Sequence, residues 1–319
     1  MIGELAHTLR MKLLRRFALD PEIKALRERV ERLENGLNDR LGAALDERFE
    51  KASREEARLD GLQARLFALQ QLVTASPSAR PPGAREAVAK LGTPAVSVIL
   101  PTYNRERFVG EAIASVQAQS FPAWELVVVD DGSSDATEQV VAAFLSDRRI
   151  SYVRQHNAGS SAARNRGLEA TSAPLVAYLD SDNTWYPDFL ALAVDHMSVH
   201  PEIDFVYGAL VTFLHNLNSA CILWEPFDRE RLVAGNFIDT NVVVHRRELV
   251  ARYGLWDPRL SRLNDWDLAL RYTADKRAHP LKALAAYYRQ VDSKRVSETI
   301  DADPEIETIR AKLRSSQRL

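Results

Sequence analysis

The middle third of the chain carries apolar, strand-like runs that each end abruptly in a cluster of carboxylates. VVVDDGSSD covers residues 127–135, and YLDSDN covers residues 178–183. Unpaired carboxylates are costly to bury, so they are expected at strand ends that face a crevice. Asp180 and Asp182 are two residues apart, a spacing that lets both reach one hard divalent cation, Mn²⁺ or Mg²⁺. Such a cation would attract a diphosphate, which indicates an enzyme that handles a nucleotide-linked donor.

Strand-like and helical stretches alternate from residue 94 onward. Continuous Val, Ile and Leu runs are typical of parallel strands buried on both faces, and intervening helices complete a layered α/β domain. We predict such a domain over residues 94–300, with a mostly parallel sheet and ligands bound beyond the carboxyl ends of the strands. The expected strands cover residues 96–100, 126–129, 150–153, 175–179, 205–208 and 241–244, and the expected helices cover 107–119, 136–145, 161–170, 187–200 and 265–276.

Residues 1–74 are interpreted as a separate helical segment. Apolar residues recur three and four apart over residues 23–37 and again over residues 59–73, with Arg, Glu and Asp between them. This patterning is typical of a coiled coil and favours a homo-oligomer, the alternative being a long helix folded back on its own catalytic domain. Residues 75–93 contain Pro, Gly and Ser and predict a linker, and residues 301–319 predict a C-terminal helical tail.

The bulk composition excludes several classes of function. The formal net charge of −2 argues against a nucleic-acid binder. The single cysteine, Cys221, cannot form an intramolecular disulfide and fits a reducing compartment. Cytoplasmic residence is expected, because no apolar stretch reaches the ~20 residues that span a bilayer and no signal-peptide pattern opens the chain. Residues 5–19 are amphipathic and basic, which predicts either peripheral contact with the inner face of a membrane or a solvated helix face.

Two strand ends supply candidate groups for a nucleotide. The first expected strand is followed by PTYNR, residues 101–105, whose polar side chains would enter the crevice. The second is followed by Asp130 and Asp131, where a carboxylate could accept the imide N–H of uracil or thymine, or pair with the N1–H and N2 donors of guanine. Capping of the next helix is the alternative role for one aspartate, although two adjacent aspartates exceed what a cap requires.

Two further residues have both a chemical and a purely structural interpretation. A Gly/Ser turn opens the helix that carries Arg164, so this arginine could add a cation beside a nucleotide or form a surface salt bridge. Asp265 lies at the start of a helix in NDWD. It could take the proton of an attacking hydroxyl in a sugar transfer with inversion, or it could cap the helix.

Five motifs in order, PTYNR, VVVDDGSSD, NAGSSAARNRG, YLDSDN and GLWDPRL with NDWDLALR, resemble the inverting glycosyltransferases of family 2. The resemblance covers roughly residues 96–289 and implies the GT-A fold, a Rossmann-like nucleotide-diphospho-sugar transferase domain. It also implies Asp265 as the general base and the DXD pair Asp180 and Asp182 as metal ligands. The donor site implied in this way comprises Pro101, Thr102, Tyr103, Asn104, Asp130, Asp131, Arg164, Asp180, Ser181 and Asp182.

Two positions depart from the family pattern. Asn183 stands where the family often has aspartate, and Asn264 replaces the glutamate that usually precedes the base. The Q-x-x-R-W motif of processive synthases is absent from the sequence, which favours a single transfer over polymerisation.

The function expected on this basis is transfer of a sugar from a nucleotide-diphosphate sugar, with UDP favoured, to a hydroxyl of a glycan or lipid-linked glycan in cell-envelope polysaccharide synthesis. A catalytically weak assembly module that acts through its coiled coil is the alternative. A sugar nucleotidyltransferase would need a Gly-rich, basic loop after the first strand, and PTYNRERF is not one. The acceptor is expected to meet residues 204–244, whose aromatic residues could stack on a sugar or fill the core.

Overall fold

The computed structural model describes residues 93–214, 219–289 and 303–316. Two compact units divide the chain at residue 59, and every described residue belongs to the second unit. The predicted coiled coil over residues 1–74, its basic opening segment and nearly all of the predicted linker lie outside the described residues, and remain predictions. Within the described part of the chain, no helix is both long enough and apolar enough to cross a bilayer.

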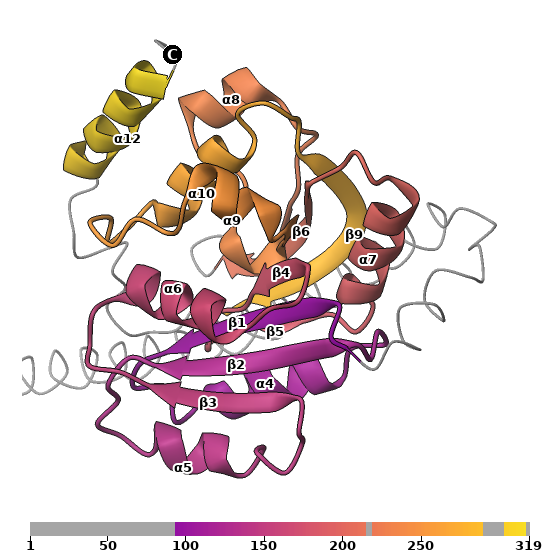
Figure 1. Ribbon diagram of the computed structural model, residues 1–319, viewed down its shortest axis with the longest axis vertical. Coiled ribbons are helices and arrows are strands. Elements are labelled where there is room, and N and C mark those ends of the chain that lie inside the picture. The colour runs from indigo at the N-terminus through magenta and orange to yellow at the C-terminus, as the bar shows by residue number, and fades with distance from the viewer. Residues whose placement is uncertain (1–92, 215–218, 290–302, 317–319) are drawn as a thin grey trace, which may run out of the picture. The chain divides into compact units, whose positions relative to one another are not determined.

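The first half of the sheet is parallel, as the alternation of strands and helices predicts. Its strands lie in the order β3-β2-β1-β4, and β1 pairs in parallel with both β2 and β4. Figure 1 shows these strands side by side in one layer. All residues of β1 and β4 are buried, which explains their continuous apolar sequences. The strands are β1 (Val96–Thr102), β2 (Trp124–Asp130), β3 (Ile150–Arg154) and β4 (Leu175–Tyr178).

The second half of the sheet is mixed. Strand β8 runs antiparallel to both β4 and β6, whereas β6 and β9 are parallel. The strands expected over residues 205–208 and 241–244 are present as β6 and β8, but β5, β7 and β9 were not predicted. Strand β5 has only two residues, too few for a pattern. The strands are β5 (Thr184–Trp185), β6 (Phe205–Leu214), β7 (Ser219–Leu223), β8 (Val243–Arg246) and β9 (His279–Tyr288).

Helix α6 (Ser160–Ala170) packs directly on the parallel strands. A Cβ atom added to Gly167 would lie 2.5 Å from Ile99 Cγ2 of β1, closer than real Cβ contacts come. Glycine is therefore required for this approach, which places Arg164, one turn earlier on α6, behind the strand ends. The other helices are α4 (Val109–Gln117), α5 (Thr137–Ala142), α7 (Phe189–Val199), α8 (Arg229–Ala234), η2 (Thr240–Val242), α9 (Glu248–Tyr253), α10 (Asn264–Tyr272) and α12 (Asp303–Ser316).

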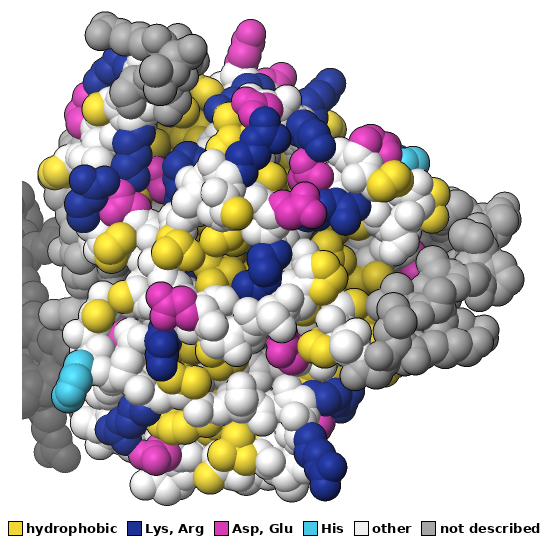
Figure 2. Space-filling model, viewed as in Figure 1, with side chains coloured by type: hydrophobic (Ala, Val, Ile, Leu, Met, Phe, Trp, Pro, Cys, Tyr) yellow, Lys and Arg dark blue, Asp and Glu magenta, His cyan; other side chains and the backbone are white. Residues whose placement is uncertain are grey.

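The aromatic residues expected to meet an acceptor belong mainly to the packed interior. Phe227 is buried, and Phe237 packs against the main core. Trp224 packs against a smaller apolar cluster, and its Nε1–H donates to the Leu281 carbonyl at 2.9 Å. These three side chains therefore fill the fold, as the structural interpretation predicts. On the face shown in Figure 2, acidic and basic side chains of the described residues are interspersed.

Candidate active site

A cavity of about 750 Å³ lies where the carboxyl ends of β1, β2 and β4 meet. Its volume is within the range of small-molecule sites, and its position is the one expected for ligands of open α/β sheets. Three of the predicted site residues, Asn104, Asp130 and Arg164, are outside its wall. The predicted residues that line it are Pro101, Thr102, Tyr103, Asp131, Asp180, Ser181, Asp182 and Asp265.

The two adjacent aspartates after β2 have different surroundings. Asp130 is fully buried, and its carboxylate accepts from Ser133 N–H at 2.7 Å and from the Tyr152 hydroxyl at 2.6 Å. Burial, followed by this hydrogen bond to Asp130, raises the pKa of Tyr152. One oxygen of Asp130 therefore closes the turn after β2, and the other binds Tyr152 on the neighbouring strand β3.

Asp131, in contrast, lies on the cavity wall. Its carboxylate accepts from the backbone N–H groups of Ala158 and Gly159 at 2.9 and 2.8 Å, and from Gln155 Nε2 at 2.7 Å. These bonds tie the end of β2 to the loop that opens α6. Because charge-assisted bonds hold the carboxylate in place, Asp131 presents a fixed acceptor at this end of the cavity.

Both non-glycine residues with positive φ in the described ranges flank the cavity. Asn104 has φ 51° and accepts from Ser134 N–H at 2.8 Å, so it joins the loop after β1 to the loop after β2. Leu263 has φ 52°, immediately before α10. A left-handed leucine is strained, and such strain is characteristic of functional sites.

Asp180 and Asp182 lie on the cavity wall, each beside an arginine. Asp180 Oδ1 accepts from Arg164 Nη2 at 2.7 Å, and Asp182 Oδ2 accepts from Arg105 Nε at 3.3 Å. Burial and the negative charge of Asp180 raise the pKa of Asp182, and Arg105 offsets only part of this. A cation would neutralise this pair, and carboxylate oxygens are the ligands that Mg²⁺ and Mn²⁺ prefer. The residues present therefore fit a divalent cation.

The described residues contain no group of three or more His, Cys, Asp or Glu side chains arranged to hold a metal ion. This does not conflict with the fit at Asp182. Magnesium in phosphate-handling enzymes is commonly held by one or two carboxylates, and substrate phosphates and water complete the coordination. Asp182 and Asp180 would be the one or two carboxylate ligands that the protein contributes.

Arg164 is not a surface arginine. Only 5% of its surface is exposed, and its guanidinium lies over the Trp256 ring at 4.6 Å. One end donates to Asp180, while Nε and Nη1 have no hydrogen-bond partner among the described residues. The surface salt-bridge interpretation is therefore wrong: Arg164 is a buried cation directly behind the carboxylate of Asp180.

Asp265 lies in the first turn of α10 and faces the cavity. It is not the capping residue, which is Leu263, and its Oδ1 accepts from the neighbouring Trp266 N–H at 2.8 Å. Its Oδ2 accepts from Asn236 Nδ2 at 3.0 Å. Burial raises the pKa of Asp265, with a smaller lowering effect from Arg164. The carboxylate is thus a stronger base than an ordinary aspartate.

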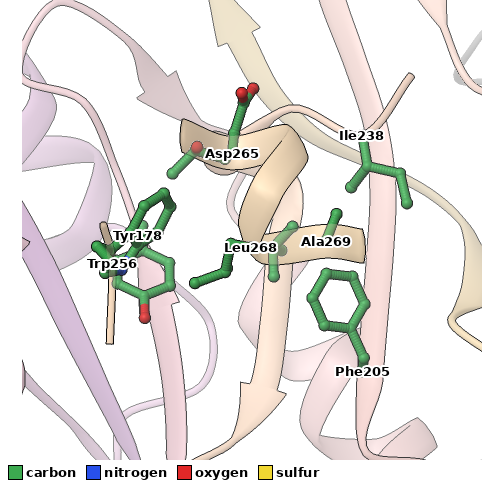
Figure 3. Close-up of a pocket in the computed structure, with 9 residues that line it drawn as sticks. Tyr178, Phe205, Ile238, Trp256, Asp265, Leu268 and Ala269 are labelled. Carbon is green, nitrogen blue, oxygen red and sulfur yellow. The ribbon is translucent and has the colours of Figure 1, made fainter. Parts of the chain in front are cut away.

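Apolar side chains behind Asp265 account for part of its burial. A second cavity, of about 10 Å³, lies against Asp265 and is lined mainly by apolar side chains, among them Tyr178, Trp256 and Leu268. Figure 3 shows the carboxylate of Asp265 pointing away from these rings and from Leu268. One side of Asp265 therefore meets a low-dielectric wall, which disfavours the charged form.

Sequence reasoning missed a fifth carboxylate in the cavity, Asp239, beside Asp131, Asp180, Asp182 and Asp265. Its Oδ1 accepts from the N–H and Nδ2 of Asn241 at 2.8 and 2.7 Å. Burial, together with the charges of Asp265 and Asp180, raises the pKa of Asp239 to about 7. Asp239 precedes β8, and the amino end of this antiparallel strand lies at the same edge as the carboxyl ends of its parallel neighbours.

Asn183, a departure from the family pattern, has a structural role. It is buried, and its Oδ1 accepts from Arg289 N–H at 3.0 Å. This bond fixes the end of β9, where Tyr288 and Arg289 line the cavity. Asn183 therefore supports the cavity wall.

The comparison with protein families agrees with this geometry. Residues 97–232 match the family model described as Glycosyl transferase family 2. A relative from Escherichia coli, the UDP-Glc:alpha-D-GlcNAc-diphosphoundecaprenol beta-1,3-glucosyltransferase WfgD, is 40% identical over 35% of this chain and 44% of its own. The putative teichuronic acid biosynthesis glycosyltransferase TuaG from Bacillus subtilis is 40% identical over 33% of this chain and 42% of its own. This chain spans about half or less of the curated relatives it matches, from 14% to 54% of their length.

Solved structures establish the fold. The S. aureus TarS 1-349 structure in complex with UDP-GlcNAc has a TM-score of 0.58 and 21% identity, covering 67% of this chain and 64% of that one. The mannosyltransferase PcManGT from Pyrobaculum calidifontis, in complex with GDP-Man and Mn²⁺, has a TM-score of 0.51 and 20% identity, covering 77% and 68%. The fold is thus that of GT-A transferases, and the fold-class prediction is confirmed. The chain carries a glycosyltransferase domain of family 2.

Proposed function

We propose that this domain is a metal-dependent inverting glycosyltransferase that moves one sugar from a nucleotide-diphosphate sugar to a hydroxyl of a glycan or lipid-linked glycan. One observation carries the proposal: Asp131, Asp182 and Asp265, which come from three separate segments, line a single cavity. They match three chemical needs of such a transfer, namely recognition of a base, neutralisation of a diphosphate and removal of a proton.

The base end of the donor would lie against Pro101, Thr102, Tyr103 and Asp131. Asp131 can accept the imide N–H of uracil, and cytosine would be repelled because its N3 is itself an acceptor. Thymine has the same imide N–H, so UDP and dTDP both fit, and of these we favour UDP. Support comes from the E. coli relative, whose name includes UDP-Glc. The Pyrobaculum neighbour is in complex with GDP-Man, so guanine is the competing base.

The diphosphate end would lie at the DXD pair. Asp182, assisted by Asp180, would hold Mn²⁺ or Mg²⁺, and the position of both carboxylates on the cavity wall supports a cation at this point. A bound cation supplies a Lewis acid that neutralises charge on the leaving diphosphate. The guanidinium of Arg105, 3.3 Å from Asp182 Oδ2, adds a positive group that can pair with a phosphate oxygen.

Asp265 would act as the general base. The acceptor hydroxyl oxygen attacks the anomeric carbon while the bond from that carbon to the diphosphate breaks, and the hydroxyl proton passes to Asp265. Attack from the face opposite the leaving group inverts the anomeric configuration. The apolar wall behind Asp265 supports this role because it raises the proton affinity of the carboxylate.

The acceptor and the cellular setting belong to the proposal as well. The names of the E. coli and B. subtilis relatives, which include a diphosphoundecaprenol-linked sugar and teichuronic acid biosynthesis, support a cell-envelope glycan as acceptor. We place the transfer in the cytoplasm. The domain boundaries and the homo-oligomer expected from residues 1–74 remain part of the proposal, with a weakly catalytic assembly module as the alternative.

A nucleotide-release assay tests the function. UDP-, dTDP- and GDP-sugars are incubated with Mn²⁺ and GlcNAc-diphosphoundecaprenol, the acceptor class in the name of the E. coli relative. We expect acceptor-dependent release of one nucleoside diphosphate that EDTA abolishes and that Asp265→Asn removes. Release that proceeds equally in Asp265→Asn, or no release from any donor with a range of glycan acceptors, would contradict the proposal.

A further inference from the structure

The C-terminal helix α12 packs on the catalytic domain beside the cavity wall. Ile309 is 1% exposed, and Ile306 and Leu313 pack against the same apolar core. These residues are three and four apart, so they form one face of the helix. An apolar face packed in this way anchors α12, and its polar side chains are then available to hold neighbouring segments.

The first polar contact is made by Glu305. Its carboxylate accepts from Ser261 N–H at 2.9 Å, from the Ser261 hydroxyl at 2.6 Å and from Arg262 N–H at 2.9 Å. Ser261 and Arg262 both line the 750 Å³ cavity. A carboxylate that receives three donors from two consecutive residues fixes the backbone of that loop, because charge-assisted bonds are stronger than neutral ones.

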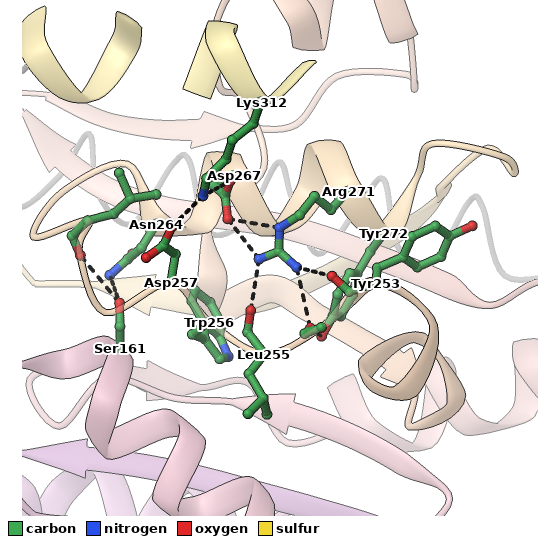
Figure 4. A network of polar contacts seen from close by, with 12 residues as sticks. Ser161, Tyr253, Leu255, Trp256, Asp257, Asn264, Asp267, Arg271, Tyr272 and Lys312 are labelled. Carbon is green, nitrogen blue, oxygen red and sulfur yellow. Dashed lines mark hydrogen bonds and ion pairs between the residues drawn. The ribbon is translucent and has the colours of Figure 1, made fainter. Parts of the chain in front are cut away.

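The second polar contact is made by Lys312, about two turns further along the same side of α12. Its Nζ lies 2.5 Å from Asp257 Oδ2 and 2.8 Å from Asp267 Oδ1. Asp267 is only 2% exposed, and its other oxygen pairs with Arg271. Figure 4 shows Lys312 reaching from α12 to both aspartates. Asp257 lies before Ser261 and Arg262, and Asp267 lies after them in α10. Lys312 therefore holds both the start of the loop that contains Ser261 and Arg262 and the helix that follows this loop.

This loop needs external support. It runs from Asp257 to Leu263, and it ends in the left-handed, strained leucine that starts α10. Asp265 follows two residues later, so the conformation of the loop sets where the proposed base lies. If Asp265 takes the proton of the acceptor hydroxyl, as proposed, the wall formed by this loop is the acceptor side of the cavity.

We infer that α12 is a clamp in which Glu305 and Lys312 are positioning residues for the acceptor-side loop, residues 257–263, and for Asp265. The inference rests on the proposed function for its catalytic consequence, but its structural part stands alone. Neither residue touches the reacting atoms. Removal of either should loosen the loop and leave the nucleotide end of the cavity, at Asp131 and Asp182, unchanged.

Hydrogen–deuterium exchange on the full chain tests the clamp without any substrate. Glu305→Ala is compared with Glu307→Ala, a matched glutamate on the same helix that pairs with Arg310. Lys312→Met is compared with Arg314→Met, which alters an exposed arginine. We expect roughly tenfold faster exchange at the Ser261 and Arg262 amides in Glu305→Ala, and faster exchange over residues 257–265 in Lys312→Met, with no change in β2. Equal exchange in each variant and its control would overturn the clamp.

Kinetics separate positioning from simple stabilisation. At a temperature well below the unfolding transition, Lys312→Met should lower kcat/KM for the acceptor by roughly tenfold and leave the dissociation constant of UDP within about twofold. A lower melting temperature with unchanged kinetics would show a structural role only and overturn the inference. If the wild-type protein turns over no donor, the proposed function fails, and the exchange experiment still decides whether α12 is a clamp.

Discussion

Asn241 holds Asp180 from two sides. Its Oδ1 accepts from the backbone N–H of Asp180 at 2.7 Å, and its Nδ2 donates to Asp180 Oδ2 at 3.1 Å. The same Nδ2 donates to Asp239 at 2.7 Å. The fully buried amide of Asn241 thus joins Asp180, a proposed metal ligand at the end of β4, to Asp239. Asp239 is 59 residues later in the chain and is another carboxylate of the cavity.

Replacement of Asn241 by alanine should therefore release Asp180. The Asp180 N–H would lose its acceptor, and one oxygen of each of two carboxylates would lose a donor. We expect a destabilisation of about 1–3 kcal/mol, read as a lower melting temperature, together with weaker nucleotide binding in the presence of Mn²⁺. Titration calorimetry of UDP with Mn²⁺ measures the second effect, and unchanged affinity in the folded variant would show that Asp180 needs no such support.

The two aspartates after β2 should respond differently to the same substitution. Asp131 faces the cavity and Asp130 does not, so Asp131→Asn should weaken UDP binding by roughly tenfold or more. Asp130→Asn is the matched control, and its UDP affinity should stay within about threefold of wild type while its melting temperature falls. Calorimetry with both variants decides the assignment, which fails if Asp130→Asn loses the affinity instead.

Asp265→Asn should abolish most turnover and spare donor binding. Loss of a general base typically costs a factor of ~10²–10⁴ in rate. The amide can still accept from Trp266 N–H, so the first turn of α10 should remain formed. Single-turnover kinetics with a saturating donor measure the rate. Because burial raises the pKa of Asp265, wild-type activity should also fall on the acid side at a higher pH than an ordinary carboxyl would give.

The raised pKa of Asp239 should make the folded protein less stable as the pH rises. Its pKa is raised from 3.8 to about 7 in the folded protein. The folded state therefore binds more protons than the unfolded state between these values, and the contribution of the protonated carboxyl is lost as pH rises through about 7. In metal-free buffer, Asp239→Asn should melt at least about 2 °C higher than wild type at pH 8, and the difference should shrink towards pH 4.

Calorimetric scans of Asp239→Asn at several pH values test this. Asp275→Asn, at an exposed aspartate that pairs with Arg252, serves as the control and should not show the same trend. A pH-independent difference between Asp239→Asn and wild type would contradict the sign derived from the raised pKa.

The sequence was sufficient for the parallel half of the sheet and its strand ends. Apolar runs identified β1, β2 and β4, and the polar residues that follow these three strands do meet in one cavity. The sequence could not show which of the two aspartates, Asp130 or Asp131, faces the cavity. Neighbouring residues at a strand end point in opposite directions, and the register against Tyr152 and the loop before α6 decides which one faces the cavity.

The missed features depend on contacts between distant segments. Asp239 lies just before η2, which leads into β8, and only the antiparallel direction of β8 brings this end to the cavity. The contact between Glu305 and Ser261 joins residues 44 apart, across residues 290–302, which the structure does not describe. Local periodicity carries no information on either arrangement, because both follow from how the second half of the sheet and α12 pack.

The most direct test of the account is the effect of UDP on the melting temperature, with and without Mn²⁺, for wild type and Asp182→Asn. Ligand at ~100 times its dissociation constant adds about 2.7 kcal/mol of stability, which corresponds to several degrees in a domain of this size. We expect this shift in the wild type only with Mn²⁺, and its loss in Asp182→Asn. An increase in melting temperature that is the same without Mn²⁺ and in Asp182→Asn would contradict a metal-dependent nucleotide-sugar site at Asp182. The absence of any increase with UDP, dTDP or GDP would contradict it as well.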